Sequence, residues 1–535
     1  MSSLHAAAQT VVAHSGFTTG LVEPGAISAP SFSYRLLAPV LVVIGAALVG
    51  VLVEAFAPRK GRHTAQVVVA LAGLVGAMVA VVLAADGRKA STAAEAVVID
   101  GPTLFLQGAI LVLAALGVLT MAERFTGNEG DAFTSTAASV PGSSYEAATA
   151  RAGWVQTEVF PLTMIAVAGM LLFPAAGDLL TMFVALEVLS LPLYLLSGMA
   201  RRRRLLSQEA ALKYFLLGSF SSAFFLFGSA MLFGFAGSLY LDDIAAAVST
   251  RGGQDGLLLL GVGLVTIGLL FKVGAVPFHA WTPDVYQGAP TPVTGFMAAC
   301  TKVAAFGALL RFLYVGVAGA RWDFEPVLWA VAILTMVVGS VVAIAQTDVK
   351  RMLAYSSIAH AGFILTGVLA FDRSGLSASM FYLVAYGFTT IGAFAVVTLV
   401  RDSAGEATHM SQWAGLARRS PLLAGTFTLF LLAFAGIPLT SGFSGKFAVF
   451  SAAVANGGTW LAVVGVLCSA IAAYFYVRVI VLMYFTEPDG EVVKVASPSA
   501  YTIVAIGVSA AVTVLLGVAP SLLLDLADRS ALFLP

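Results

Sequence analysis

Long apolar stretches separated by short polar segments run along almost the whole chain. Each stretch has about 20 or more mostly apolar residues, which is enough to cross the hydrocarbon core of a bilayer. They lie at 34–57, 64–85, 102–122, 156–175, 177–199, 207–236, 256–276, 291–316, 325–346, 350–371, 376–401, 421–456, 459–486 and 498–523. The pattern predicts an all-α polytopic membrane protein with about fourteen transmembrane helices.

The composition agrees with a chain that turns most of its surface towards lipid. Hydrophobic residues make up 59% of the 535 residues and charged residues only 10%, and the mean hydropathy is +0.95. A soluble domain carries about 25% charged residues. Because 28 basic residues balance 28 acidic ones, the chain has no basic field that would hold nucleic acid.

Motifs for cofactors and metals are missing from the sequence. Cys300 and Cys468 are its two cysteines, and both lie in apolar stretches, whereas an iron–sulfur cluster takes about four cysteine ligands. The six histidines are scattered and do not have zinc-binding spacing, and neither a dinucleotide-binding fingerprint nor a P-loop is present. We therefore predict no cofactor or metal in this chain.

Basic residues are distributed unequally between the two sets of predicted loops. Loops after odd-numbered spans hold most of them: Arg59, Lys60, Arg62, Arg124, Arg151, Arg201 to Arg204, Lys350, Arg351, Arg418, Arg419 and Lys494. Loops after even-numbered spans hold Arg88, Lys89, Arg251, Arg321 and Arg373. Since basic loops stay in the cytoplasm, we expect both termini outside and interpret the run at 201–204 as a topology anchor.

Five charged residues within the apolar stretches are candidates for a shared role. They are Glu187 and four of the eight lysines: Lys213, Lys272, Lys302 and Lys446. A charge near a helix centre costs about 2.5–3.5 kcal/mol on insertion scales, so these side chains should face one another or internal water. Two alternatives are structural: Lys213 lies early enough in its helix to reach the membrane surface, and Glu187 could only bond a neighbouring helix. Five such charges together indicate a proton or ion path.

Glu187 and Lys213 lie on consecutive predicted helices joined by the turn at 201–204. At about 1.5 Å rise per residue, their depths differ by only about 8 Å, and neighbouring helices pack about 8–10 Å apart. We therefore expect the two side chains to approach each other or to share a water. A desolvated lysine can release its proton, whereas arginine stays charged, which suits lysine to proton transfer.

Two of the predicted helices contain breaks beside a lysine. Pro277 follows Lys272 in LLFKVGAVPFHAWTPDVYQGAPTPVTGF, and Pro438 precedes Lys446 in LLAFAGIPLTSGFSGKFAVF. A proline leaves helical carbonyls without partners at membrane depth, and paired broken helices are typical of transporters built from inverted repeats. KYFLLGSFS and FYLVAYGFT are a further weak similarity between the halves. We predict two inverted five-helix repeats, each with a broken helix.

His279 lies at the first break, and His360 lies in YSSIAHAGF. Both are candidate proton relays because histidine titrates near neutral pH. For His279, a neutral imidazole bonded to the carbonyls freed by the break is an equally good interpretation.

The pattern divides the chain into six segments. They are an outside N-terminal extension (1–33), three transmembrane helices (34–122), a polar cytoplasmic loop (123–155), a first repeat (156–316), a second repeat (325–486), and a last helix with a tail (498–535). The extension has no Lys or Arg and so lacks the basic start of a cleavable signal.

Three strings carry a resemblance to a known family. VPFHAWTPDVYQGAPTPVTGF, LEVLSLPLYLLSG around Glu187 and TDVKRMLAYSSIAHAG around His360 resemble the antiporter-like membrane subunits of respiratory complex I, the NADH–quinone oxidoreductase. The resemblance covers roughly 34–525. DVYQGAP, Lys302 and Lys446 are similar to the N type of these subunits, whereas the M and L types differ at such positions.

The resemblance implies roles for the buried charges. Glu187 and Lys213 would form a coupling pair, Lys272 would be the lysine of the seventh helix, Lys302 a connecting lysine and Lys446 a terminal one. Protons would cross the subunit along this axis, driven by quinone reduction in partner subunits that hold NADH, flavin, iron–sulfur clusters and quinone. The partners would be other antiporter-like and small helical subunits in a bacterial cell membrane.

Two other functions are compatible with the sequence. A subunit of a multi-subunit cation/proton antiporter would share the fold and the charged axis but would be driven by an ion gradient. A purely structural membrane subunit would use its charges to lock helices together, and replacing Lys272 would then impair assembly but leave pumping intact.

Overall fold

The computed structural model describes residues 32–85, 90–125, 131–136, 140, 143–152, 154–251, 256–402, 405–488 and 493–534. Nearly all of the predicted N-terminal extension, 1–33, lies outside these ranges, as do parts of the predicted loop at 123–155.

The N-terminal part contains three long helices. They are α2 (Tyr34–Phe56), α3 (Arg59–Ala84) and α4 (Gly101–Met121), and a hairpin of β1 (Ala90–Thr92) and β2 (Val97–Ile99) joins the last two. The hairpin is antiparallel, with Ala90 opposite Ile99. A short helix, α5 (Ser144–Arg151), follows in the predicted polar loop.

The segment predicted as the first repeat, 156–316, contains seven helices and one long crossing in its described residues. Its helices are α6 (Val159–Leu172) with η1 (Phe173–Ala175), α7 (Leu179–Ser197), α8 (Arg204–Ala236), α9 (Leu241–Arg251), α10 (Gly256–Val273) and α11 (Trp281–Gly288). One long crossing then runs through α12 (Thr291–Phe296), η2 (Met297–Thr301), α13 (Lys302–Arg311) and η3 (Phe312–Gly316). Both η2 and η3 are π-helical turns.

The second predicted repeat follows η4 (Ala318–Ala320). Its helices are α14 (Arg321–Ile344), α15 (Val349–Val368), α16 (Arg373–Leu399), η5 (Met410–Trp413), α17 (Leu416–Arg419), α18 (Pro421–Ala435), α19 (Ser441–Ala455) and α20 (Thr459–Phe485). The chain ends with α21 (Ala500–Val518) and α22 (Ser521–Ser530). A small antiparallel sheet, in the order β4–β3–β5, is made of β3 (Val400–Asp402), β4 (Gly405–Glu406) and β5 (Lys494–Val495).

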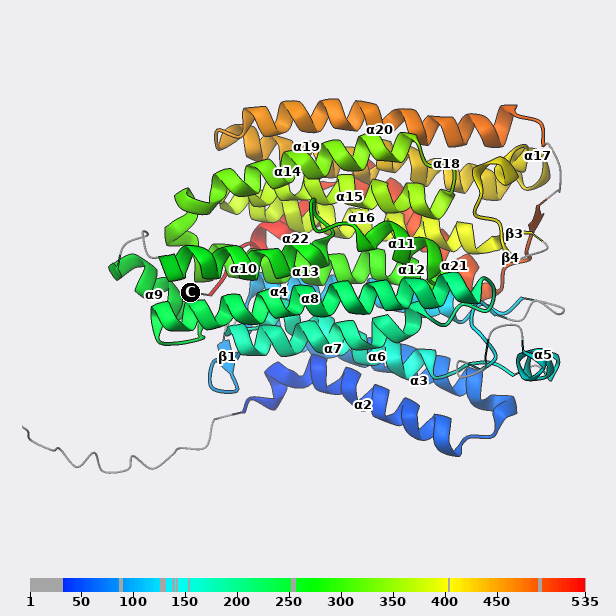
Figure 1. The fold of residues 1–535 in the computed structure, drawn as a ribbon, viewed down its shortest axis with the longest axis horizontal. Helices are drawn as coiled ribbons and strands as arrows, with labels where there is room; N and C mark the ends of the chain where they lie inside the picture. The colour runs from blue at the N-terminus through cyan, green and yellow to red at the C-terminus, as the bar shows by residue number, and fades with distance from the viewer. Residues whose placement is uncertain are drawn as a thin grey trace, which may run out of the picture.

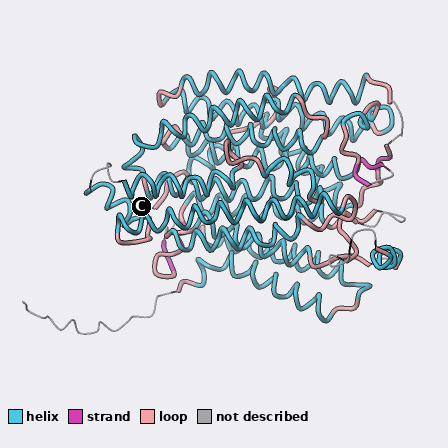
Figure 2. The backbone as a smooth tube through the Cα atoms, in the orientation of Figure 1, coloured by secondary structure: helices cyan, strands magenta, loops and turns pink. Residues whose placement is uncertain are grey.

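The long helices run side by side in one bundle, with α2 at one edge and α20 at the opposite edge (Figure 1). Figure 2 shows the strands of the described residues near the two ends of the bundle. The crossing at 291–316 and α16 form its centre, because their most apolar windows are completely buried, whereas only 28% of the α2 window is. The outer faces carry exposed apolar side chains such as Leu48, Phe220 and Val466, as expected for helices in contact with lipid.

Four aspartates set the starts of four helices. The carboxylates of Asp100, Asp178, Asp348 and Asp372 each accept a hydrogen bond from the backbone N–H three residues later, at 3.0, 2.7, 3.0 and 2.7 Å. A carboxylate at this position satisfies a helix N–H that has no partner within the helix and favours the positive end of the helix dipole. These caps fix where α4, α7, α15 and α16 begin.

The observed helices confirm the predicted fold class. Eleven helices are long and apolar enough to cross a membrane, and Val159–Ala175 and Pro421–Ala435 are shorter apolar helices. With α15 and with the α18–α19 pair taken as one crossing, the described residues make the fourteen crossings predicted from the apolar stretches. Most helix bounds lie within about three residues of the predicted ones; α3 extends furthest, beginning at Arg59 rather than 64.

Both predicted helix breaks are present and share one backbone geometry. After α10, Gly274 has φ +80°, and the N–H groups of Gly274 and Ala275 both donate to Leu270 O, each at 3.0 Å. After α18, Gly436 has φ +84°, and the N–H groups of Gly436 and Ile437 both donate to Leu432 O at 3.0 and 3.1 Å. Glycine adopts this left-handed conformation without a Cβ clash. Pro277 and Pro438 lie just beyond these turns.

Candidate functional site

Lys272 lies in the last turn of α10, directly before the first break. Its side chain is buried, with 4% of the residue exposed, and its Nζ donates a hydrogen bond to the Tyr214 hydroxyl at 3.3 Å. The ammonium also lies 4.9 Å from the centre of the Tyr214 ring and 5.4 Å from that of Tyr194. Ring faces and a hydroxyl therefore stabilise this cation where water is largely excluded.

Tyr214 is held in place by a stack of aromatic rings. Its ring lies parallel to that of Trp281, with 4.6 Å between ring centres, and the Trp281 indole N–H donates to Phe271 O at 2.9 Å. Trp281 is the first residue of α11. The break therefore brings α11 back against α8 and α10 and positions the tyrosine that binds Lys272.

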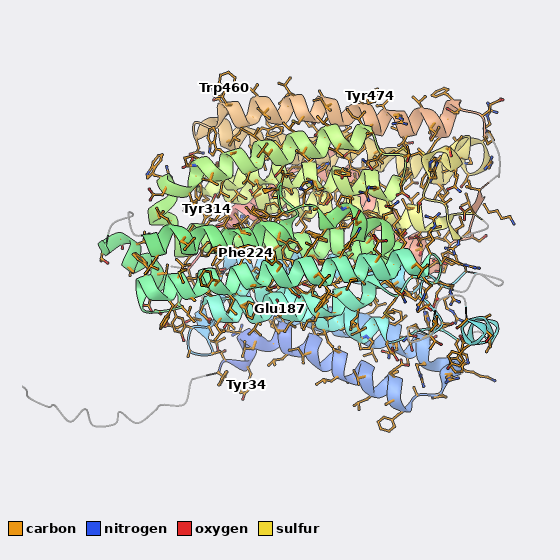
Figure 3. All side chains as sticks on the ribbon, viewed as in Figure 1. Tyr34, Glu187, Phe224, Tyr314, Trp460 and Tyr474 are labelled. Atoms are coloured by element: carbon orange, nitrogen blue, oxygen red, sulfur yellow. The ribbon has the colours of Figure 1, made fainter. Side chains whose placement is uncertain are left out.

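Glu187 is the acidic residue whose charge acts on Lys272. It is half-buried and lies in the middle of α7, where Figure 3 labels it. Its Oε1 is buried without a hydrogen-bond partner among the described residues. Buried polar atoms normally have partners, so this unsatisfied carboxylate oxygen is consistent with the expected role of Glu187 in the site.

Among the described residues, Lys213 forms ion pairs with other carboxylates and not with Glu187. The Lys213 side chain is 42% exposed, and its Nζ forms ion pairs with Glu209 Oε1 at 2.7 Å and Asp284 Oδ2 at 2.8 Å. Successive residues on a helix point about 100° apart, and on α8 it is Tyr214, next to Lys213, that faces Lys272. The depth arithmetic gave the height of each residue but not the direction in which its side chain points.

Lys302 follows the π-helical turn η2 at the start of α13, in the long crossing at 291–316. It is buried, its Nζ donates to Ser357 O at 2.7 Å, and it lies 5.5 Å from the centre of the Tyr386 ring. Its partner is thus a backbone carbonyl of α15. Single π-turns are frequent at functional sites.

His360 lies at the centre of a chain of hydroxyl groups. Its Nδ1 is 2.8 Å from the Tyr382 hydroxyl, and its Nε2 is 3.4 Å from the Tyr476 hydroxyl, which also bonds to Ser356 Oγ. The imidazole is buried among aromatic rings, and the charges of Lys446 and Lys302 both act on it. Hydroxyl and imidazole groups both donate and accept hydrogen bonds, so this chain can pass a proton.

Lys446 binds the backbone carbonyls at the second break. Its Nζ donates to Phe434 O at 2.8 Å, Ala435 O at 3.0 Å and Ser469 Oγ at 2.7 Å. The two carbonyls are those at the end of α18 that the break leaves without helical partners. The predicted unpaired carbonyls are therefore present, and a buried lysine satisfies them.

His279 lies in the first break and is half-exposed. Its Nδ1 has no hydrogen-bond partner among the described residues. Among the described residues, no hydrogen bond or ion pair joins it to the lysines, so the structure does not bring it into the axis that contains His360.

Comparison with known proteins identifies the family of this chain. A family described as "NADH:quinone oxidoreductase/Mrp antiporter, TM" matches residues 176–472. NADH-quinone oxidoreductase subunit N of Rhodococcus opacus is 61% identical over 533 residues, which cover 96% of this chain and 98% of the relative. The chain belongs to the subunit N family of NADH-quinone oxidoreductases. Subunit N of Mycobacterium tuberculosis is 56% identical and covers 94% of this chain, and 99% of that relative is matched.

Solved structures agree with the family and also show how widely its fold is shared. A chain of respiratory complex I from Thermus thermophilus is similar with a TM-score of 0.74 and 32% identity, covering 92% of this chain and 99% of that one. A chain of the Mrp complex from Dietzia has a TM-score of 0.79 at 22% identity, covering 94% of this chain and 97% of that one. The second similarity shows the fold alone. The predicted resemblance to complex I is confirmed, and the cation/proton antiporter remains the less supported alternative.

Several residues of the subunit N site were not singled out from the sequence. Tyr214, Tyr382 and Tyr476 supply the hydroxyls around the charged residues. Tyrosine is common in apolar helices. A tyrosine is therefore recognised as part of the site only by its contact with Lys272 or His360 in the folded structure. Tyr382 falls in FYLVAYGFT, the segment compared with KYFLLGSFS, and that comparison was the available signal.

Lys350 also has a different environment from the one predicted. It was counted among loop charges, but only 1% of the residue is exposed, and its Nζ contacts Ala289 O at 2.7 Å and Glu406 Oε2 at 3.2 Å. Burial raises the pKa of the Glu406 carboxyl, but Lys350 and the Thr291 hydroxyl outweigh burial and hold that pKa below its usual value. This pair joins α15 to the small sheet.

None of the described residues forms a group of three or more histidines, cysteines, aspartates or glutamates that could hold a metal ion. Cys300 and Cys468 are both free and buried.

Proposed function

We propose that this chain is the proton-translocating membrane subunit of an NADH–quinone oxidoreductase, and that protons cross it along Glu187, Lys272, Lys302, His360 and Lys446. The observation that carries the proposal is the set of three buried lysines. Among the described residues none of the three forms a salt bridge, and their hydrogen-bond partners are a tyrosine hydroxyl, a serine hydroxyl and backbone carbonyls.

Such surroundings suit a lysine that changes its protonation state. Burial disfavours the ammonium, whereas carbonyls, hydroxyls and ring faces favour it. The opposition brings the protonated and neutral forms closer in free energy than in water. A salt bridge would instead hold the lysine in its charged form.

Part of a route is present between Lys302 and His360. Lys302 bonds the carbonyl of Ser357, and the Ser356 side chain next to it bonds the Tyr476 hydroxyl, which contacts His360. The charge of Lys446 acts on the same imidazole. A proton arriving at Lys302 would therefore favour release at His360 or Lys446 through charge repulsion.

The energy must come from partner subunits. Moving one charge against 100 mV requires about 2.3 kcal/mol, and this sequence has no motif for a nucleotide or redox centre. We propose that NADH, flavin, iron–sulfur clusters and quinone are bound by partners, and that other antiporter-like and small helical subunits adjoin this chain in a bacterial cell membrane.

We further propose that the end of the bundle carrying β3, β4 and β5 faces the cytoplasm and that both termini lie outside. The basic residues Arg201 to Arg204, Arg418 and Arg419 lie in connections at that end, and the positive-inside rule places such connections in the cytoplasm. The matching breaks after α10 and α18 support a division into repeats at 156–316 and 325–486.

Lys213 and His279 enter the proposal in different ways. Lys213 contacts Asp284, which is also bound by Arg351 Nη1 at 2.6 Å, and we propose that this cluster links α8, α11 and α15 beside the first buried lysine. His279 is proposed as a relay only for water that reaches the first break.

The test is NADH-driven proton pumping in membrane vesicles carrying Glu187→Gln, Lys272→Ala, Lys302→Ala or Lys446→Ala, with Lys494→Ala as the control. Lys494 is exposed in β5. Losing a hydrogen bond to a charged group costs about 1.5–3 kcal/mol, so pumping should fall roughly tenfold to a hundredfold, with NADH oxidation falling in parallel. Normal pumping in fully assembled complexes of all four variants would refute the proposal.

Two measurements separate the alternatives. Copurification of inhibitor-sensitive NADH–quinone activity with a tag on this chain excludes the cation antiporter, and a tagged complex that has other antiporter-like subunits but no such activity favours it. A double-mutant cycle separates partners: Glu187→Gln should be non-additive with Lys272→Ala and additive with Lys213→Ala. A structural subunit would instead show poor assembly with normal pumping per complex.

A further inference from the structure

A polar cavity lies apart from the buried axis, at the turn between α2 and α3. Its volume is about 570 Å³, and its lining comes from the α2–α3 turn, from the segment after α4 and from the segment leading into α6. The lining includes Arg59, Lys60 and Arg124 and the aromatic ring of Trp154. None of these residues takes part in the proton-transfer proposal.

The cavity has an excess of positive charge. Arg59, Lys60 and Arg124 form no ion pair among the described residues, whereas Arg62 is paired with Glu54 at 2.7 Å. Glu54 also accepts hydrogen bonds from Gln66 and Thr157, so its carboxylate is satisfied. The other lining carboxylate, Glu158, accepts a hydrogen bond from Gln156. The lining therefore contains three cations that form no ion pair, and only one carboxylate, that of Glu158, that also forms none among the described residues.

An aromatic ring holds one of these cations in place. The guanidinium of Arg59 lies over the Trp154 ring, 3.9 Å from its centre. This stacking leaves the edge of the guanidinium, with its N–H donors, available for an anion. Tryptophan is also the residue that concentrates at the level of lipid headgroups.

The cavity adjoins a surface built for lipid chains. Phe56, the last residue of α2, is 83% exposed, and Leu52 and Leu48 are exposed one and two turns further along the same helix. Figure 1 shows α2 at the edge of the bundle. A ligand with a phosphate in the cavity would have an apolar helix face directly beside it, which free phosphate would not use.

We propose that this cavity binds the phosphate headgroup of an anionic phospholipid whose acyl chains lie along α2. Arg59 and Arg124 would donate charge-assisted hydrogen bonds to the phosphate oxygens, and Lys60 would add a point charge. Such a lipid would fasten the α2–α3 hairpin to the rest of the bundle through α6.

The test uses the purified complex in nanodiscs that contain a photoactivatable phosphatidylglycerol analogue, followed by mass spectrometry of labelled peptides. The expected label lies on 54–63 and 154–158. The matched phosphatidylcholine analogue should label these peptides weakly. A variant carrying Arg59→Gln, Lys60→Gln and Arg124→Gln should bind about 100-fold more weakly, since each cation near an anionic surface contributes about fivefold.

Two controls make the result decisive. The variant Arg418→Gln, Arg419→Gln and Lys494→Gln removes the same number of charges elsewhere on this end and should leave the label unchanged. Arg59→Gln alone keeps the Arg62–Glu54 pair and should reduce labelling about fivefold. This single variant tests the proposal even if the triple variant assembles poorly. Equal labelling by the zwitterionic analogue, labelling that survives the substitutions, or displacement of the label by 10 mM inorganic phosphate would overturn the proposal.

Discussion

The ion pair of Asp100 and Arg311 provides a quantitative test of how the bundle is held together. Both side chains are almost completely buried, at 0% and 1% exposure, and Arg311 Nη2 lies 2.8 Å from each Asp100 oxygen. Arg311 also donates to Pro174 O at 2.7 Å, while Asp100 accepts the N–H groups of Thr103 and Leu534. The pair thus joins α4, η1, α13 and the C-terminal tail.

Replacing Arg311 with methionine should strongly destabilise the chain. The change leaves a buried carboxylate without its cation, for which the expected loss is about 3–5 kcal/mol. Asp100→Asn keeps the helix cap but also breaks the pair. In the double variant Asp100→Asn/Arg311→Met no unpaired charge remains, so its destabilisation should be smaller than the sum of the two single changes by about 2 kcal/mol or more.

The assay is thermal unfolding of the tagged complex in mild detergent, followed by fluorescence-detected size exclusion. The matched control is Arg373→Met, which breaks the exposed pair with Asp528 at the same end of the bundle, where the side chains are 58% and 54% exposed; it should change stability by at most about 1 kcal/mol. Additive effects of the Asp100 and Arg311 substitutions, or equal effects of Arg311→Met and Arg373→Met, would refute the reasoning.

Three further predictions follow from single contacts. Tyr214→Phe keeps the ring stack but removes the hydroxyl that binds Lys272; proton pumping should fall about tenfold, because a hydrogen bond to a charged group contributes about 1.5–3 kcal/mol. Gly442→Ala places a Cβ only 1.8 Å from Ala433 O, so the yield of assembled complex should fall sharply through backbone overpacking. The pKa of Glu406 is lowered in the folded protein, so its ionised carboxylate stabilises the fold. This stabilisation should be complete above a pH of about 4.3, the usual pKa of this group in an unfolded chain, and should disappear as the pH falls further through the folded-state pKa. Thermal unfolding measured as a function of pH checks it.

Each of these predictions has a matched control. Tyr194→Phe removes a hydroxyl that has no hydrogen-bond partner among the described residues, so pumping should stay near normal; an equal loss in both tyrosine variants would contradict the Tyr214 prediction. Gly45→Ala meets no atom within 4 Å and should assemble normally. In Glu406→Gln the acid-dependent part of the unfolding curve should be absent, and an unchanged pH profile would show that this carboxyl does not contribute.

Much of the fold was predictable because a membrane simplifies the problem. Every crossing needs about 20 apolar residues, and backbone groups in lipid must be satisfied within the helix, so each helix is visible in the apolar pattern. The π-turn η2 and the buried pair Asp100–Arg311 were not predicted. Neither leaves a local pattern, since a π-turn uses ordinary helical residues and an ion pair joins side chains 211 positions apart.

The candidate site was predicted in its residues more than in its contacts. The cost of burying a charge makes Glu187, Lys272, Lys302 and Lys446 conspicuous in any apolar stretch, so their selection needed no structure. Their partners could not be found in this way. Tyrosine and serine cost little free energy in a membrane helix, so they do not stand out in the sequence. A backbone carbonyl is present at every position, so no residue type marks the one that binds a lysine.

The sequence by itself determined which segments cross the membrane, where two helices break and that Lys272, Lys302 and Lys446 are buried, because all three depend on local composition and on free energies of transfer into lipid. Only the tertiary structure decided which of these charges meet. Lys213 and Tyr214 are neighbours in the chain, yet one reaches Asp284 and the other Lys272. A helix turns by about 100° per residue, and the packing of the surrounding helices sets which of those directions leads into the axis.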